Sequence, residues 1–125
     1  MIKKTKRLKK KNIINDKGTL ILSKNILKKF NLKRFFFIKS DKKLIRGEHG
    51  HKNCNQIFLS LSNSIAVEVK NKIGKKNFIL RKYDSIFVPK KNWVRIKFKK
   101  YNSELLVLCD KDFDKNDYFY SLDKI

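Results

Sequence analysis

The chain has 125 residues, of which 41% are hydrophobic, so it can form one folded core and is too apolar to be intrinsically disordered. Its longest apolar runs, such as residues 35–38, are far shorter than the roughly 20 residues that cross a bilayer. Lysine and arginine number 33 against 11 acidic residues, and this net charge of +22 favours a polyanionic partner, either nucleic acid or a phosphate-bearing small molecule.

The basic residues are mostly lysines that are spread along the chain, and they accompany many isoleucines and asparagines. We therefore favour compositional drift over selected nucleic-acid binding as the source of the charge. The start of the chain is positive but lacks the apolar core of a secretory signal, so no export is indicated and a cytoplasmic protein is expected. We expect a single domain over residues 1–125, of which residues 1–11 form a basic segment.

From residue 18 onward, apolar and polar residues alternate in short runs that are separated by turn residues. In the run 64–70, Ile65, Val67 and Val69 share one face, as expected of a half-buried strand. The predicted strands are residues 19–23, 34–38, 56–61, 64–70, 76–80, 85–88, 93–98 and 105–109.

The segments between these strands include two turn candidates, at residues 62–63 and 71–75, and the second contains Gly74 as a hairpin loop would. Short helices are expected at residues 25–30 and 113–120. Many short, closely spaced strands predict an all-β fold, a barrel or a sandwich.

Two cysteines, Cys54 and Cys109, could in principle form a disulfide. We expect both to be reduced and mostly buried, because this is the usual state of cysteines in a small intracellular protein. Neither belongs to a C-x-x-C pair, so the sequence gives no support for a zinc or redox motif.

The only two histidines of the chain, His49 and His51, lie two residues apart. On an extended segment such residues point to the same face, so both imidazoles should project together. Arg46 precedes the pair, Lys52 follows it, and Gln56 begins the next predicted strand. Two titratable rings, two cations and an amide therefore lie within eleven residues, and the rings are candidates for proton transfer.

The H-x-H-x4-Q pattern of His49, His51 and Gln56, followed by residues 89–94, resembles the two motifs of the cupin superfamily of small β-barrels, or jelly rolls. In metal-binding cupins three histidines and a glutamate hold the ion. Here Gln56 matches the glutamate and Val94 matches the third histidine, and two imidazoles with a neutral amide are a poor site for a divalent cation. We expect neither a metal nor a cofactor.

Within the cupins, the chain most resembles the metal-free dTDP-4-oxo-6-deoxy-D-glucose 3,4-ketoisomerases. Residues 46–52 match that family's R-G-x-H-A-H-K, and residues 33–38 are similar to its K-R-V-Y-Y-I. The other similar segments, in order along the chain, are residues 15–20, 84–89 with Trp93, 105–110, 113–114 and 117–118.

This resemblance implies an isomerase that moves a keto group from C4 to C3 of a dTDP-linked 6-deoxyhexose, in the biosynthesis of an unusual deoxysugar. It implies His49 and His51 as the catalytic acid and base, with Arg46 and Lys52 on the diphosphate and Gln56 on sugar hydroxyls. It also implies a homodimer, in which N-terminal strands can be exchanged between subunits.

The chain departs from the family's pattern in three places. Phe36 and Phe37 stand where the family usually has a tyrosine, Val94 stands where a histidine usually follows the tryptophan, and residues 42–43 are lysines where the family places an arginine. A non-catalytic cupin that binds a nucleotide sugar is therefore the alternative. A third hypothesis is a nucleic-acid-binding β-barrel, based on the charge and on ten phenylalanines that could stack on bases.

Overall fold

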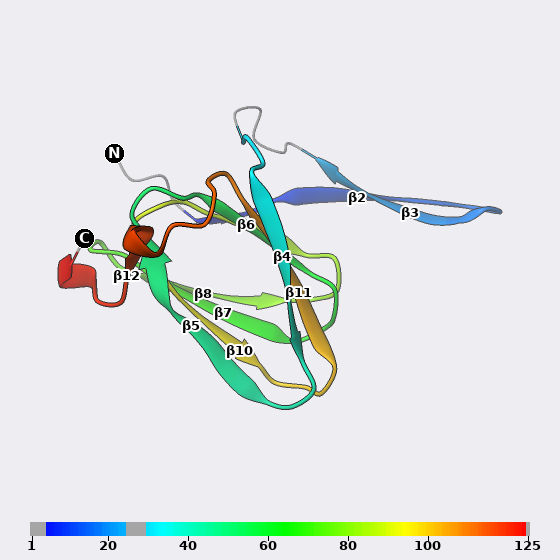
Figure 1. Ribbon diagram of the computed structural model, residues 1–125. Coiled ribbons are helices and arrows are strands. Elements are labelled where there is room, and N and C mark those ends of the chain that lie inside the picture. Colours follow the sequence, from blue (N-terminus) through cyan, green and yellow to red (C-terminus); the bar gives the residue numbers. More distant parts are fainter. Residues whose placement is uncertain (1–4, 25–29, 125) are drawn as a thin grey trace.

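The computed structural model describes residues 5–24 and 30–124, which form two five-stranded antiparallel sheets and a separate hairpin (Figure 1). The first sheet has the order β1 (Lys6–Arg7), β9 (Ser85–Val88), β6 (Gln56–Ser60), β11 (Ser103–Cys109) and β4 (Arg34–Ser40). The second has the order β12 (Tyr118–Phe119), β5 (Leu44–His51), β10 (Trp93–Phe98), β7 (Ile65–Lys70) and β8 (Lys75–Leu80). The hairpin pairs β2 (Lys9–Asn15) with β3 (Gly18–Lys24).

The apolar core lies between the two sheets, because alternate residues of each strand face inward. Along β7 and β11 buried and half-buried positions alternate without a break. Each large apolar side chain buried in this way contributes about 1.5–3 kcal/mol to folding. The largest fully buried side chains of the core are Phe98, Ile65, Leu80, Ile86, Leu105, Val67 and Val107.

The expected all-β fold is confirmed, and every predicted strand is present to within two residues at its ends. The strands at Lys6–Arg7, Lys9–Asn15, Leu44–His51 and Tyr118–Phe119 were not predicted. The predicted helix at 113–120 is wrong. Asp114 caps only a single 3-10 turn, Lys115–Asp117, after which the chain extends into β12.

The helix predicted at residues 25–30 falls mostly outside the described residues. A second 3-10 turn spans Leu122–Lys124. Within residues 5–24 and 30–124, no helix has the length and apolar character needed to cross a membrane.

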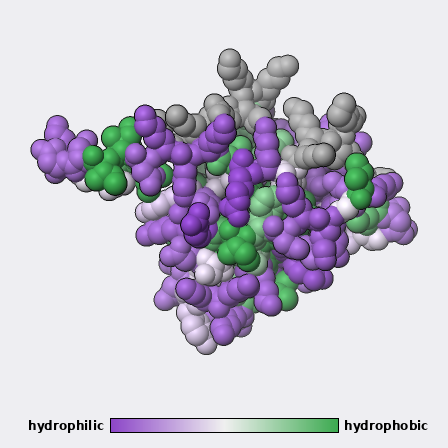
Figure 2. Space-filling model, turned by 180° about the vertical axis from the view of Figure 1, so that it is seen from behind, coloured by the Kyte–Doolittle hydropathy of each residue, from purple (hydrophilic) through white to green (hydrophobic). Residues whose placement is uncertain are grey.

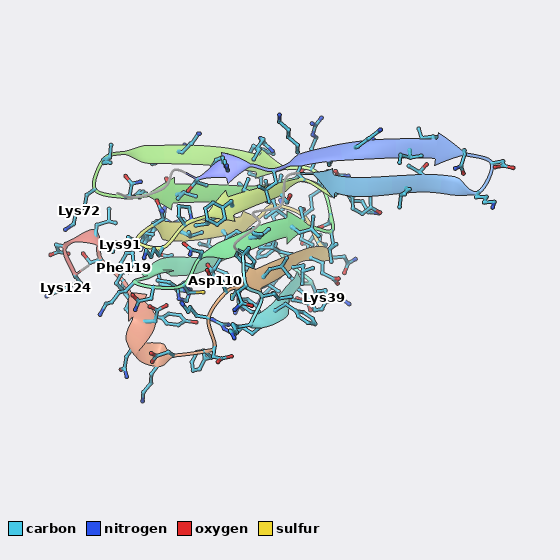
Figure 3. All side chains as sticks on the ribbon, turned by 90° about the horizontal axis from the view of Figure 1, so that it is seen from above. Lys39, Lys72, Lys91, Asp110, Phe119 and Lys124 are labelled. Carbon is cyan, nitrogen blue, oxygen red and sulfur yellow. The ribbon has the colours of Figure 1, made fainter. Side chains whose placement is uncertain are left out.

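The β2–β3 hairpin extends away from the two sheets, as Figures 1 and 3 show. Its base is held by the side chain of Asp84, which accepts a hydrogen bond of 2.7 Å from Lys10 Nζ and also pairs with Arg7. Along the hairpin, Ile14 is 76% exposed and Leu20 is 55% exposed, and Figure 2 shows hydrophobic side chains on the projecting arm. An isolated two-stranded hairpin is at best marginally stable in water and needs packing on its apolar side chains. The exposure of Ile14 and Leu20 shows that this packing is missing on the projecting arm.

Candidate active site

The histidine-bearing strand β5 contains a β-bulge that determines which side chains face the interior. Opposite β10, the pairing passes from Arg46 and Gly47 directly to His49, so that Glu48 is an extra residue. Gly47 and Glu48 have positive φ angles of 84° and 61°, and glycine adopts such an angle without steric cost. In a regular strand Arg46 and His49, three residues apart, would face opposite sides. With the bulge, the side chains of Arg46 and His49 share a face, and their partners on β10 are the buried residues Ile96 and Val94.

Gly47 is tightly constrained at this bulge. A Cβ atom there would lie 2.8 Å from the backbone oxygen of Val94, closer than real Cβ contacts allow. Gly50, between the two histidines, is equally constrained, since its Cβ would lie 2.2 Å from the Asn92 oxygen and 2.4 Å from the Phe119 ring. Both glycines of the G-x-H-G-H segment are therefore required by close approach of neighbouring groups.

A cavity of about 390 Å³ opens between the two sheets at this strand. Both histidines line it, as the sequence predicted, and so do Arg46 and Gln56. The remaining lining residues are Phe36, Phe37, Ile38, Lys39, Gly47, Phe58, Val94, Ile96, Val107 and Tyr118. The cavity thus combines apolar walls with a group of polar and charged side chains, an arrangement suited to a polar small molecule.

His51 is buried and is held by a carboxylate from the other end of the chain. Its Nδ1 lies 3.0 Å from Oδ2 of Asp117, and Oδ1 of Asp117 accepts a hydrogen bond of 2.7 Å from the backbone N–H of Asn53. Because a carboxylate can only accept, Nδ1 of the neutral ring carries the proton, and Nε2 is the nitrogen that can take one up.

Burial lowers the pKa of His51 below its ordinary value, and the hydrogen bond and the charge of Asp117 only partly oppose this effect. The ring is therefore neutral near pH 7. A neutral imidazole with a fixed tautomer is suited to act as a general base.

His49 lies beside His51, with 5.5 Å between the ring centroids. Tyr118 contacts both rings: it stacks on His49 at 4.7 Å with an interplanar angle of 18° and meets His51 edge-on at 4.5 Å. Tyr118 is brought there because β12 pairs with β5 directly opposite His51. The cavity therefore contains a phenol in addition to two imidazoles.

Gln56 is buried at the end of β6, where its side-chain Nε2 donates to Sγ of Cys109 at 3.3 Å. Because Nε2 is engaged by the sulfur, Oε1 is the acceptor that this cavity-lining amide still offers. Cys54 and Cys109 are both free thiols and buried, as the sequence predicted.

The structure does not bring Lys52 into the cavity, whose lining residues do not include it. The backbone N–H of Lys52 instead donates to the backbone carbonyl oxygen of Asp117 at 2.8 Å. Three lining or supporting residues were not singled out from the sequence: Lys39, Asp117 and Tyr118. The only sequence signal for the last two was the similarity of residues 117–118 to the family's D-Y pair.

Two residues of β10 lie outside the cavity lining. Arg95 has a side chain that is 41% exposed and pairs with Glu48 and Glu68 at 3.7 and 3.6 Å. Trp93 is buried. Within the described part of the chain, no group of three or more His, Cys, Asp or Glu side chains is placed to hold a metal ion.

Comparison with known proteins identifies the family. A family model described as "FdtA: WxcM-like, C-terminal" matches residues 3–125. The chain belongs to the FdtA family. No curated protein sequence matches it significantly.

Several solved structures are similar to the chain over nearly its whole length. A 3,4-ketoisomerase from Helicobacter canadensis is 28% identical, with a TM-score of 0.83 and coverage of 96% of this chain and 92% of that one. QdtA, a sugar 3,4-ketoisomerase from Thermoanaerobacterium thermosaccharolyticum solved with TDP, is 25% identical, with a TM-score of 0.83 and coverage of 99% and 93%. WlaRB, a TDP-quinovose 3,4-ketoisomerase from Campylobacter jejuni, is 27% identical, with a TM-score of 0.85 and coverage of 98% and 97%.

More distant similarity supports the fold. The RmlC epimerase of Mycobacterium tuberculosis is only 11% identical, yet it has a TM-score of 0.77 with coverage of 91% of this chain and 66% of that chain. The FdtA-family chain is therefore a cupin-type jelly roll, as its sequence motifs indicated, and its resemblance to the sugar 3,4-ketoisomerases is confirmed.

Proposed function

We propose that this chain is a sugar 3,4-ketoisomerase that moves the keto group of a dTDP-4-oxo-6-deoxyhexose from C4 to C3. The observation that carries the proposal is the cavity, in which a neutral buried base, His51, lies beside a second imidazole and a phenol. The three solved 3,4-ketoisomerases named above, each at least 25% identical over nearly the whole chain, support the same reaction.

The reaction needs only proton transfer, because the oxidation level of the sugar as a whole does not change. The C3–H bond is acidified by the adjacent C4 ketone, so Nε2 of His51 can remove this proton and leave an enediolate. Return of a proton to C4, with transfer of the C3 hydroxyl proton to the C4 oxygen, then gives the 3-ketone and a hydroxyl group at C4. His49 and Tyr118 lie close enough to His51 to stabilise the developing oxyanion or to relay the second proton.

Substrate recognition follows from the rest of the lining. Arg46 and Lys39 are the cations that line the cavity, and they suit the diphosphate because charge-assisted hydrogen bonds to phosphate are strong. Oε1 of Gln56 can accept from a sugar hydroxyl. The apolar side chains of Phe36, Phe58 and their neighbours suit the methyl group of a 6-deoxy sugar.

The direct test is to incubate the protein with dTDP-4-oxo-6-deoxyglucose in D2O and to follow product formation and deuterium at C3 and C4 by NMR. His51→Asn should abolish both, and His49→Asn should reduce both, with the folded state retained in each. Failure of the wild-type protein to exchange or convert the sugar would refute the enzymatic function.

A matched pair of variants, one at Arg46 and one at Lys52, tests which of these two cations binds the substrate. Arg46→Met should raise KM by about tenfold or more, because a charge-assisted hydrogen bond contributes about 1.5–3 kcal/mol. Lys52→Met should leave KM within about twofold if the cavity alone contacts the substrate. A larger effect at Lys52 would support the original sequence prediction that it binds the diphosphate.

A non-catalytic cupin is the second candidate, and the observation in its favour is that Phe36, on the inner side of β4, gives this side of the cavity no hydroxyl. Tight binding of dTDP without turnover of any 4-keto sugar would support this candidate. The phenol of Tyr118 on the opposite sheet argues against it.

The functional unit is proposed to be a homodimer formed through the hairpin. Besides Ile14 and Leu20, the outer side of β4 exposes Phe35 and Phe37, each 56% accessible, so both the arm and the first sheet have apolar surface to cover. Light scattering should give twice the monomer mass. A double variant, Ile14→Lys with Leu20→Lys, should elute as a monomer, and an unchanged dimer would exclude the hairpin from the interface.

The setting that we propose is cytoplasmic synthesis of an unusual deoxysugar for a surface polysaccharide, such as a lipopolysaccharide O-antigen. The free thiols of Cys54 and Cys109 are in keeping with a reducing compartment. A nucleoside diphosphate such as dTDP is a good leaving group in glycosyl transfer, so a dTDP-linked product is a suitable precursor of such a polymer.

A further inference from the structure

The two cysteines of the chain lie next to Gln56, at adjacent ends of β6 and β11. Cys54 is 2% exposed and Cys109 is 0% exposed, and both belong to the apolar cluster between the sheets. Cys109 at the end of β11 is paired with Gln56 of β6, and Cys54 precedes Gln56 by two residues. Side-chain and backbone amides of Asn55 bind the Asp110 carboxylate at 2.8 Å each, which fixes the two strand ends beside each other.

The two thiols are neighbours with different reactivity. The Cys54 thiol donates to the backbone oxygen of Asn55 at 3.4 Å and also interacts with the Cys109 sulfur, which lowers the pKa of Cys109 and raises that of Cys54. Gln56 Nε2 donates to the same Cys109 sulfur at 3.3 Å and also lowers the Cys109 pKa. Cys109 is therefore the thiol that more readily forms a thiolate, which is the nucleophilic form.

We propose that Cys54 and Cys109 are an oxidation site at which a disulfide forms and displaces the sulfur that orients Gln56 in the sugar cavity. The oxidant is a hydroperoxide. The Cys109 thiolate attacks one peroxide oxygen, the O–O bond breaks, and a sulfenic acid forms as the other oxygen leaves as hydroxide, which takes up a proton to become water. The Cys54 thiol then attacks the sulfenic sulfur, an S–S bond forms, and a second water leaves with the remaining protons.

The approach that we assign to the oxidant is from the outside of the fold, where the sequence neighbours of the two cysteines reach the surface. Asn53, Asn55, Asp110 and Lys111, the residues next to the two cysteines in sequence, line a separate surface cavity of about 580 Å³. Asp110, labelled in Figure 3, lies where β11 leaves the sheet. Local opening of these strand ends would expose the thiols without unfolding the two sheets.

The consequence for the sugar site rests on the proposed function, because it assumes that Gln56 Oε1 accepts from a sugar hydroxyl. A disulfide removes the thiolate or thiol acceptor that holds the amide, so the amide loses its fixed orientation. One neutral hydrogen bond contributes about 1 kcal/mol, which corresponds to a change in KM of about fivefold.

The test begins with the protein alone and needs no substrate. The full chain is treated with hydrogen peroxide, its remaining thiols are alkylated, and the intact mass and the peptides are measured. We expect the loss of two hydrogens per chain, no alkylation and a peptide pair joined between Cys54 and Cys109, all reversed by dithiothreitol. Thiols that stay free under conditions that oxidise glutathione, or links that form only between chains, would overturn the proposal.

Two cysteine variants then test the effect on the cavity. Cys54→Ala keeps the Cys109–Gln56 contact, so it should retain the KM of the reduced protein and lose its sensitivity to peroxide. Cys109→Ala should show the raised KM without oxidant. A disulfide that leaves KM unchanged would overturn the link to Gln56. If the reduced protein shows no turnover, the proposed function fails separately, and calorimetric affinity for dTDP-glucose takes the place of KM as the readout.

Discussion

The contact between His51 and Asp117 gives the sharpest prediction about the chemistry. Asp117 uses its two oxygens separately: Oδ2 accepts from His51 Nδ1 and Oδ1 accepts from the Asn53 backbone N–H. In Asp117→Asn only one oxygen remains for these two donors. If it keeps the Asn53 bond, the amide NH2 faces Nδ1, and the imidazole must carry its proton on Nε2 instead. The base would then be protonated at the nitrogen that faces the substrate.

The size of the effect follows from the bond that is lost. A hydrogen bond to a charged group contributes about 1.5–3 kcal/mol, so kcat/KM should fall by about 10- to 100-fold, and by more if the tautomer changes completely. The carboxylate also raises the pKa of His51 against the larger effect of burial. Without it the pKa falls further, so the acid limb of the residual kcat/KM profile should move to lower pH.

The assay is the conversion of dTDP-4-oxo-6-deoxyglucose, followed by NMR across the pH range, together with a thermal melt to verify folding. Asp114→Asn is the matched control, since Asp114 lies on the same turn and only caps it through Asn116, so its loss should change kcat/KM by less than about twofold. An Asp117→Asn protein that folds and retains the wild-type rate and pH profile would refute the assignment of His51 as the base.

Three further predictions concern stability. Gly47→Ala places a Cβ against a backbone oxygen of β10 at a φ of 84°, so it should destabilise the fold by about 1–3 kcal/mol, whereas Gly74→Ala, with open space around it, should leave the melting temperature nearly unchanged. Burial raises the pKa of Asp84, but the hydrogen bond from Lys10 and the neighbouring charges lower this pKa overall. The stability that Asp84 contributes is therefore present at neutral pH and is lost as pH falls below about 4. Asp84→Asn should melt at a lower temperature than wild type at pH 7, and the difference should be smaller at pH 3. Because burial lowers the pKa of His51, the unfolded chain binds a proton there more tightly, and stability should decrease as pH falls through about 6.5. Urea unfolding at pH 7 and pH 5 should show a smaller decrease in stability for His51→Asn than for wild type. An equal decrease in both proteins would show that the histidine is not buried as a neutral ring.

The core strands were predictable from sequence because their side chains alternate between the core and the surface. In β7 the sequence I-A-V-E-V-K gives this alternation directly, and the observed burial follows it residue by residue. The histidine pair was predictable for the same reason, since residues two apart on an extended segment share a face.

The hairpin strand β2 could not be predicted in this way. Its sequence K-K-K-N-I-I-N does not alternate between apolar and polar residues, and all seven residues are exposed. The sequence therefore marks neither face of this strand as buried. It is extended only because it pairs with β3, where for example Ile13 of β2 lies opposite Leu20 of β3. A strand stabilised by its partner strand alone, and by any further subunit, leaves little local signal.

The site itself depends on two long-range features that spacing along the chain does not reveal. The bulge at Glu48 lets Arg46 face the same chamber as His49, whereas strict alternation would place them on opposite sides. Asp117 is 66 residues from His51, and it arrives there only because β12 pairs with β5. From the sequence, Lys52 was as plausible a cavity residue as Arg46, because local spacing treats both alike.

The same burial that makes His51 a base also makes it a weak point of the fold. An exposed imidazole would be partly protonated near neutral pH, whereas desolvation keeps this one neutral and ready to accept a proton. Burial of the aspartate beside it is tolerable only because both of its oxygens are bonded. Substitutions that stabilise this end of the fold by removing the buried pair should therefore lower activity, since the polar groups that cost stability are the ones that move the proton.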